Sequence, residues 1–218
     1  MKSLILKRPL SSVGWFLLLL VSLYYIYHSC RRYFIFTEAS YRTHFWTREE
    51  WVFIHVVSGI VATLIVPFQI IRAFRKKYTR LHRGMGHTYL ISVIISSITS
   101  FYLSVTSGFN LTYVSGFACF SLVWFCTPLM GYIAIMNGNI TQHREWMIRS
   151  YVVTLGFSFI RLLKDTLVPA HLGERMDLIN TLTWISWAIP LFITELILQV
   201  RKFKKQAELI VIKSRPIQ

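Results

Sequence analysis

Blocks of about 20 apolar residues recur along this chain, and they constrain its fold more than any other feature. A helix of about that length crosses the ~30 Å hydrocarbon core of a bilayer, because each residue adds about 1.5 Å along the axis. Six such blocks follow one another within 218 residues, separated by polar or basic stretches. No soluble fold needs six of them in series, so the sequence predicts an all-α integral membrane bundle with six transmembrane helices.

The charge content agrees with a membrane protein. Only 15% of the residues are charged and 54% are hydrophobic, whereas a soluble domain carries about 25% charged residues. The net charge of +15 would also suit a nucleic-acid-binding protein, but the sequence has no nucleic-acid motif. We therefore expect the basic side chains to meet anionic lipid head groups at the cytoplasmic face of the bilayer.

The six spans are placed by apolar runs, prolines and turn residues. The first resembles a secretory signal, but no small-residue cleavage site follows it, so we interpret it as a retained span. Thr47 and Glu50 have the spacing of a capping box before the second span, which Pro67 should kink or stop near its end. The predicted spans are Val13–His28, Trp51–Ile71, Met85–Thr106, Thr112–Met136, Glu145–Leu167 and Leu178–Val200.

The distribution of lysine and arginine predicts the orientation. Seventeen of the 24 lie in the N-terminal head, in the connections after the second and fourth spans, and in the tail; seven lie on the other side. Cytoplasmic loops are enriched in these residues, so both termini should be cytoplasmic. We divide the chain into the first span with an interfacial loop (1–49), a four-helix core (50–168), and the last span with a basic tail (169–218). We expect a multi-pass protein of the bacterial inner membrane.

A shift of 61 residues places the second and third spans on the fourth and fifth. The pair His82-Arg83 then falls on His143-Arg144, and a proline falls on a proline. The agreement indicates two parallel helical hairpins, each with a His-Arg pair at the entry to its second helix. A duplication and similar physical constraints on two unrelated hairpins both account for so few identities.

Polar side chains form stripes along the third and fifth spans. On the fifth, four of them fall close to one line along the helix: His143, Ser150, Thr154 and Arg161. Lipid offers such a stripe no hydrogen-bond partner, so it should face other helices or a cavity. On the third span, the same reasoning places His82 above the polar face and His87 above a face of isoleucines.

Two histidines that enter neighbouring spans from one side have the arrangement that two axial ligands of a haem iron require. Arginine forks beside them would pair with the haem propionates. The sequence thus suggests a b-type haem or a quinone at the cytoplasmic edge, with a role in electron transfer. The candidate cofactor-binding residues are His82, Arg83, His143, Arg144, Arg149 and Arg161.

The alternative interpretation is a non-catalytic scaffold, in which the same residues grip lipid head groups or a protein partner. His82 and His143 lie before the apolar runs, whereas ligands of a buried haem usually lie deeper. No serine–histidine–acid set, metal-ligand cluster or phosphate loop has convincing spacing, so whether the chain is an enzyme stays open. Glu195, inside the last span, is expected to pair with one of three cations: Arg149, Arg201 or Lys202.

The two His-Arg motifs carry a resemblance to a known family. They read His82-Arg83-x-x-Gly86-x-x-Tyr89 and, two spans later, His143-Arg144-x-Trp146-Met147-x-Arg149-Ser150-Tyr151, with Arg161 ten residues on. This pattern resembles a bacterial membrane family catalogued as domain of unknown function 2306. The likeness covers about Trp51–Lys164 and implies a helical membrane core in which these positions matter, but no particular reaction. Family members usually have a basic residue where this chain has His87.

The arrangement is also similar to cytochrome b561-type bundles, which pair histidines between alternate helices. His55 on the second span would then need a partner on the fourth span, which has no histidine. At most one haem site could follow that pattern, and the likeness is one of fold alone.

Overall fold

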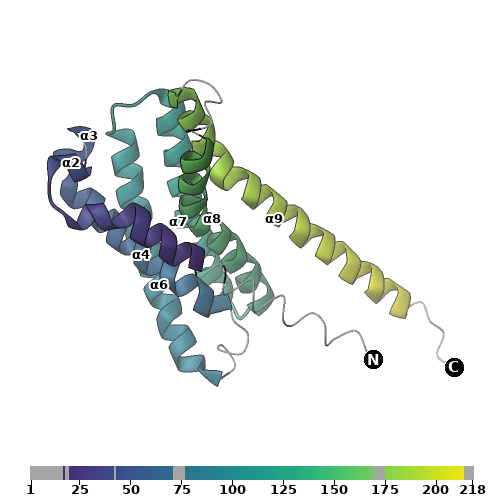
Figure 1. Cartoon of the computed structure of the whole chain (residues 1–218). Helices are drawn as coiled ribbons and strands as arrows, with labels where there is room; N and C mark the ends of the chain where they lie inside the picture. The colour runs from purple at the N-terminus through teal and green to yellow at the C-terminus, as the bar shows by residue number, and fades with distance from the viewer. Residues whose placement is uncertain are drawn as a thin grey trace.

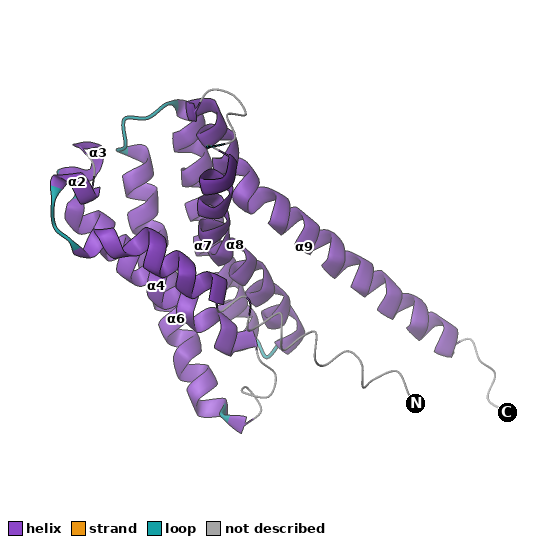
Figure 2. Cartoon of the chain, in the orientation of Figure 1, coloured by secondary structure: helices purple, strands orange, loops and turns teal. Residues whose placement is uncertain are grey.

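A computed structural model describes Leu17, residues 20–41, 43–70, 77–167, Pro169 and residues 175–213. Within these residues the chain is helical and has no strand (Figure 2). Five of the described helices are long and apolar enough to cross a membrane. They are α4 (Glu49–Ile70), α6 (Thr79–Val105), α7 (Leu111–Met136), α8 (Ile140–Leu167) and α9 (Arg175–Lys213) (Figure 1).

The second to sixth predicted spans each coincide with one of these helices. α6 begins at Thr79 rather than Met85 and runs through both glycines of its motif. Tertiary contact supports this early start, because the Gln69 amide of α4 donates a hydrogen bond of 3.1 Å to the His82 carbonyl. Pro67 does not stop α4, which continues to Ile70.

The tail and the first predicted span differ from the expectation in other ways. α9 continues beyond Val200 to Lys213, because this part of the tail is rich in lysine and has no glycine or proline. The first predicted span, Val13–His28, lies partly outside the described residues. Its described part is helical and passes into the short helices η1 (Ile26–Cys30) and η2 (Arg31–Phe34).

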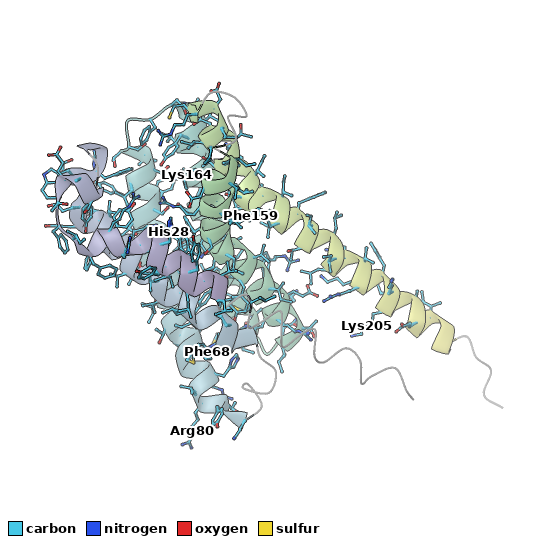
Figure 3. The ribbon with its side chains drawn as sticks, in the orientation of Figure 1. His28, Phe68, Arg80, Phe159, Lys164 and Lys205 are labelled. Atoms are coloured by element: carbon cyan, nitrogen blue, oxygen red, sulfur yellow. The ribbon has the colours of Figure 1, made fainter. Side chains whose placement is uncertain are left out.

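The bundle has two ends, which we name by what they hold. The motif end is where α6 and α8 begin, with Arg80 near it; the cavity end is where these helices finish, with Lys164 near it (Figure 3). Two further short helices, α2 (Glu38–Tyr41) and α3 (Thr43–Trp46), lie at the cavity end (Figure 1). Aromatic side chains of this segment pack on α4 and α6 around the buried Tyr41.

A cluster of buried polar side chains joins α6, α7 and α8 in the middle of the bundle. The Tyr89 hydroxyl lies 2.6 Å from Ser150 Oγ and 2.8 Å from Thr154 Oγ1. The Trp124 indole donates to the same Thr154 oxygen at 2.8 Å. The predicted stripes of the third and fifth spans therefore face each other, as expected for polar groups that lipid cannot satisfy.

Glycines let α9 approach its neighbours closely. A Cβ atom at Gly116 of α7 would lie 2.8 Å from Thr183 Cγ2 of α9, and one at Gly156 of α8 would lie 3.3 Å from the Ser186 carbonyl. Aromatic rings fill the adjoining space, with Phe120 stacked between Phe157 and Trp187. The last span is thus packed on α7 and α8 through contacts that only a residue without a side chain permits.

Charged side chains tie α9 to α8 near the motif end. Arg149 donates two hydrogen bonds, of 2.8 and 2.6 Å, to Glu195 Oε2, and Lys202 lies 2.7 Å from Glu145. The predicted pairing of Glu195 is confirmed, with Arg149 as its partner. Beyond this point α9 diverges from the other helices, and Lys205 lies well away from them (Figure 3).

We predict that Gly116→Ala destabilises the bundle. Overpacking against Thr183 should lower the free energy of unfolding by about 1–3 kcal/mol. Gly86→Ala is the matched control, since nothing lies within 4 Å of a Cβ atom there, and it should be neutral or stabilising by up to ~1 kcal/mol. Unfolding in mixed detergent micelles, followed by circular dichroism, measures both. Equal effects of the two substitutions would contradict the close approach of α7 and α9.

A second prediction concerns the ion pair between α8 and α9. Arg149→Met leaves Glu195 without its guanidinium and should cost about 1.5–3 kcal/mol, the range for hydrogen bonds to charged groups. Arg144→Met removes an exposed cation from the same helix and should change stability by less than about 0.5 kcal/mol. The same unfolding assay applies. A loss in Arg149→Met no larger than in Arg144→Met would show that the pair does not hold α9.

Candidate functional site: a polar-headed cavity at one end of the bundle

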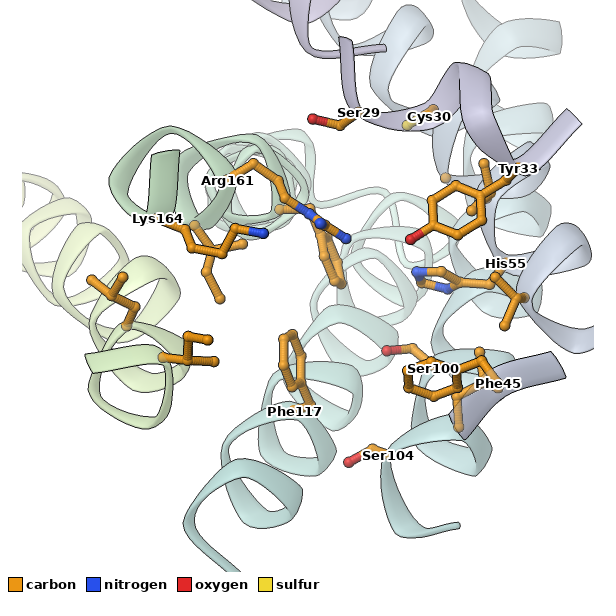
Figure 4. A pocket seen from close by; sticks show the side chains of 18 of the residues that line it. Ser29, Cys30, Tyr33, Phe45, His55, Ser100, Ser104, Phe117, Arg161 and Lys164 are labelled. Atoms are coloured by element: carbon orange, nitrogen blue, oxygen red, sulfur yellow. The ribbon is translucent and has the colours of Figure 1, made fainter. Parts of the chain in front are cut away.

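A cavity of about 500 Å³ opens at the cavity end of the bundle. Residues from η1, η2, α3, α4, α6, α7, α8 and α9 line it, so it belongs to no single hairpin. Three polar side chains converge in it from separate parts of the chain: Tyr33 from η2, His55 from α4 and Arg161 from α8 (Figure 4). Pockets of ~300–1,000 Å³ with a few converging polar groups are the usual form of small-molecule sites.

His55 is held by α6 with one ring nitrogen free for the cavity. Its Nδ1 lies 3.0 Å from the Ser96 carbonyl oxygen, and the Ser96 hydroxyl donates to the His55 carbonyl at 3.0 Å. A carbonyl can only accept, so Nδ1 carries the hydrogen, and Nε2 of the neutral ring has the lone pair. The ring edge also meets Trp124 and Phe157. His55 is therefore presented as a hydrogen-bond acceptor.

Arg161 meets phenols rather than carboxylates. Its guanidinium points toward the Tyr33 hydroxyl (Figure 4), and the phenols of Tyr25 and Tyr113 are also close enough to act on its charge. A second guanidinium, that of Arg32, donates to the same Tyr33 oxygen at 2.7 Å. None of the ion pairs among the described residues includes Arg161.

The surroundings of Arg161 shift the pKa values of two interfacial residues, Tyr33 and Cys30. Burial acts to raise the pKa of the Tyr33 phenol, but the guanidiniums of Arg161 and Arg32 outweigh it and hold that pKa below its usual value. Burial raises the pKa of the Cys30 thiol, which is hydrogen-bonded to Tyr25. Tyr33 is thus a better hydrogen-bond donor than an ordinary tyrosine, whereas Cys30 is a protonated packing residue.

The charge of the cavity wall is one-sided. Among the described residues that line it, Arg161, Lys164 and Arg175 are cationic and none is acidic. Asp165 shares an adjoining recess with Lys164 and Arg175, whereas Arg161 is the cation that converges with Tyr33 and His55 (Figure 4). The remaining wall is largely apolar and aromatic, and includes Val52, Val56, Ile60, Leu103, Phe117, Trp124, Phe157 and Ile160. Such a wall can hold an apolar body while Arg161, Tyr33 and His55 bind a polar head.

The candidate residues named from the sequence divide between the two ends. His143 uses Nδ1 to contact the Gly131 carbonyl of α7 at 2.8 Å, and His82 is half-buried where its carbonyl receives the bond from α4. Arg83 and Arg144 beside them are exposed. Arg149 is engaged by Glu195. Arg161 alone lies in the cavity, at the opposite end of α8 from His143.

From the sequence alone, His55 is not grouped with Arg161, and Tyr33 is not among the candidate residues. The available signal was depth: His55 and Arg161 both lie near the outer edge of the hydrocarbon layer, each on its own predicted span. Tyr33 gave no signal, because it lies in an irregular segment whose path over the bundle is a tertiary property. His87, in contrast, is exposed with its ring near Tyr132, as the isoleucine face of the third span predicts.

Comparison with known proteins places the chain in a family but not in a functional class. No curated protein and no solved structure matches it. A family model described as "Predicted membrane protein (DUF2306)" matches residues 52–198, from the start of α4 into the last described span. The match includes α9 as well as the two hairpins, and it covers His55 and Arg161 but not Tyr33. The chain therefore belongs to the DUF2306 family of predicted membrane proteins.

Proposed function

We propose that this membrane protein binds an amphipathic small molecule in the cavity at the end of the bundle. The observation that carries the proposal is the convergence of Tyr33, His55 and Arg161 on one largely apolar space of about 500 Å³. The three groups come from η2, α4 and α8, so their convergence depends on how these separate helices pack against one another. Two donors and one acceptor fit a head group that offers both acceptor oxygens and a hydroxyl.

The head group of a quinone and its quinol meets that description across its two redox states. Its carbonyl oxygens would accept from Arg161 and Tyr33, and the hydroxyl of the quinol would donate to His55 Nε2. The aromatic wall would hold its ring. In this form of the proposal, a quinone-linked role belongs to the cavity end, whereas the sequence alone pointed to the end that holds His82 and His143.

The expected membrane topology indicates which half of the bilayer the cavity faces. With six spans and both termini in the cytoplasm, the motif end faces the cytoplasm and the cavity opens toward the outer half of the bilayer. The exposed Arg83 and Arg144 would then meet anionic head groups of the inner leaflet, as would the cations of the helical tail. The bacterial inner membrane is the proposed location.

For the motif end we propose helix anchoring. His143 binds the α7 backbone, and the backbone of His82 binds α4 through Gln69. Each His-Arg motif thus ties the second helix of a hairpin to the first, while its arginine reaches the membrane surface. This supports the scaffold interpretation of the motifs. The haem interpretation of the same residues stays a separate hypothesis.

Photolabelling tests the binding proposal. Two amphiphiles with one medium-length alkyl chain and a diazirine, an acid and the corresponding alcohol, are offered to the protein in phosphatidylcholine nanodiscs. We expect at least one of them to label Trp124 or Phe157, which face the cavity, and mass spectrometry to locate the label. Val56→Phe narrows the cavity and should reduce this labelling at least about fivefold, because overpacking costs about 1–3 kcal/mol.

The matched control is Ile95→Phe, which adds the same ring to an exposed position of α6 and should leave the labelling unchanged. Labels found only on outward-facing residues, or labelling that Val56→Phe does not reduce, would contradict binding in the cavity.

An absorbance spectrum of the purified protein, oxidised and reduced, separates anchoring from haem binding at the motif end. We expect protein from haem-replete cells to be colourless. His143→Ala should lower the free energy of unfolding by about 1 kcal/mol, because the hydrogen bond to Gly131 is lost. A Soret band that disappears in His143→Ala would instead establish a haem and overturn the anchoring proposal.

A further inference from the structure

The charges of the cavity point to the class of ligand. We propose that it binds an acidic amphiphile, with a carboxylate or phosphate oxygen at Arg161 and Tyr33 and an apolar chain or ring system along the aromatic wall. This inference rests on the proposed binding function and deepens it, because a neutral quinone and an acidic amphiphile make different demands on the site.

The charge balance of the cavity favours an anionic ligand. A guanidinium withdrawn from water is costly unless an anion accompanies it. The groups that act on the Arg161 charge within the described chain are phenols, and the described lining residues include no carboxylate. Even if Tyr33 were ionised, two guanidiniums would share one phenolate, since Arg32 binds the same oxygen. Among the described residues a net positive charge is left, and an anionic head group would balance it.

The positions of the polar side chains also favour an anionic head group. The Arg161 side chain extends from α8 across the cavity toward Tyr33 and His55, and Lys164 points into the same space from one turn further along (Figure 4). Arg161 presents a planar set of donors that matches the oxygens of a carboxylate or phosphate. The Tyr33 oxygen accepts from Arg32 and faces the Arg161 guanidinium (Figure 4), so its own hydrogen is available to donate. Both groups therefore offer hydrogens to one acceptor-rich head.

His55 refines the choice of head group. Its Nε2 lone pair accepts a hydrogen, and the Ser96 carbonyl fixes that orientation. A fully ionised carboxylate gives His55 no hydrogen, so the ring must face the protonated oxygen of a phosphate monoester, a hydroxyl on the ligand, or a water molecule. The apolar body would run along Phe117, Trp124 and Phe157, which line the same cavity.

The test compares head groups on one alkyl chain. A photoreactive acid, alkyl phosphate and alcohol are each titrated into the protein in phosphatidylcholine nanodiscs, and the labelling of Trp124 and Phe157 is measured. The pH is about 8.5, where a carboxylic acid in water is ionised. We expect both anionic probes to bind about tenfold or more tightly than the alcohol, as for a hydrogen bond to a charged group. Arg161→Gln should abolish the difference and Arg161→Lys should retain part of it. Arg144→Gln, an exposed cation at the motif end, should leave the difference intact.

The outcomes separate this inference from the binding function itself. Tighter binding of the acid than of the phosphate would indicate a fatty-acid-like ligand, and the reverse order a phosphate-headed lipid; both support the inference. Equal labelling by acid, phosphate and alcohol in the wild type, reduced for all three by Val56→Phe, would overturn the inference and leave the binding function standing. This comparison needs only the wild-type protein and the three probes, so the inference is tested even if the Arg161→Gln variant does not fold. Absence of label in the cavity from every probe would overturn both.

Discussion

Hydrogen bonding at the Tyr89 hydroxyl is the interaction on which the rest of the bundle depends. In a hydrocarbon layer, a polar side chain without a partner is costly, and the partner must come from another helix. Tyr89 meets that requirement with Ser150 and Thr154, and Thr154 also accepts from Trp124. One cluster therefore sets the rotation of α6, α7 and α8 about their axes. Once those rotations are set, the other polar groups on the same faces have defined positions.

The positions of His55 and Arg161 follow from this arrangement. Arg161 lies seven residues after Thr154, on the same face of α8 and nearer its end. His55 is placed by Ser96, which lies seven residues after Tyr89 on α6. Each is two helical turns from the central cluster toward the cavity end. The hydroxyl cluster therefore acts as the rigid support of the cavity, while the motif end is closed by direct helix-to-helix bonds and ion pairs.

The two ends of the bundle differ in how their charges are satisfied. At the motif end, Arg149 has Glu195 and Lys202 has Glu145. At the cavity end, the named partners of Arg161 are tyrosine hydroxyls, and the described cavity wall adds no acid. A paired charge stabilises the packing of its own helices, whereas a charge left without an anion in a cavity stabilises whatever anion enters. This contrast is why we assign structure to one end and binding to the other.

The sequence by itself determined the spans after the first, the faces of α6 and α8 that look inward, and the need of Glu195 for a cation; the tertiary structure selected Arg149 among three candidates. Periodicity and length carry that information, because a helix has a fixed repeat and lipid offers polar groups no partner. It did not determine that Tyr33, His55 and Arg161 share one cavity. Their meeting depends on how α4 crosses α6, on how far α9 stands from α8, and on the path of an irregular aromatic segment across the end of the bundle. These are relations between elements, and no repeat within one element encodes them.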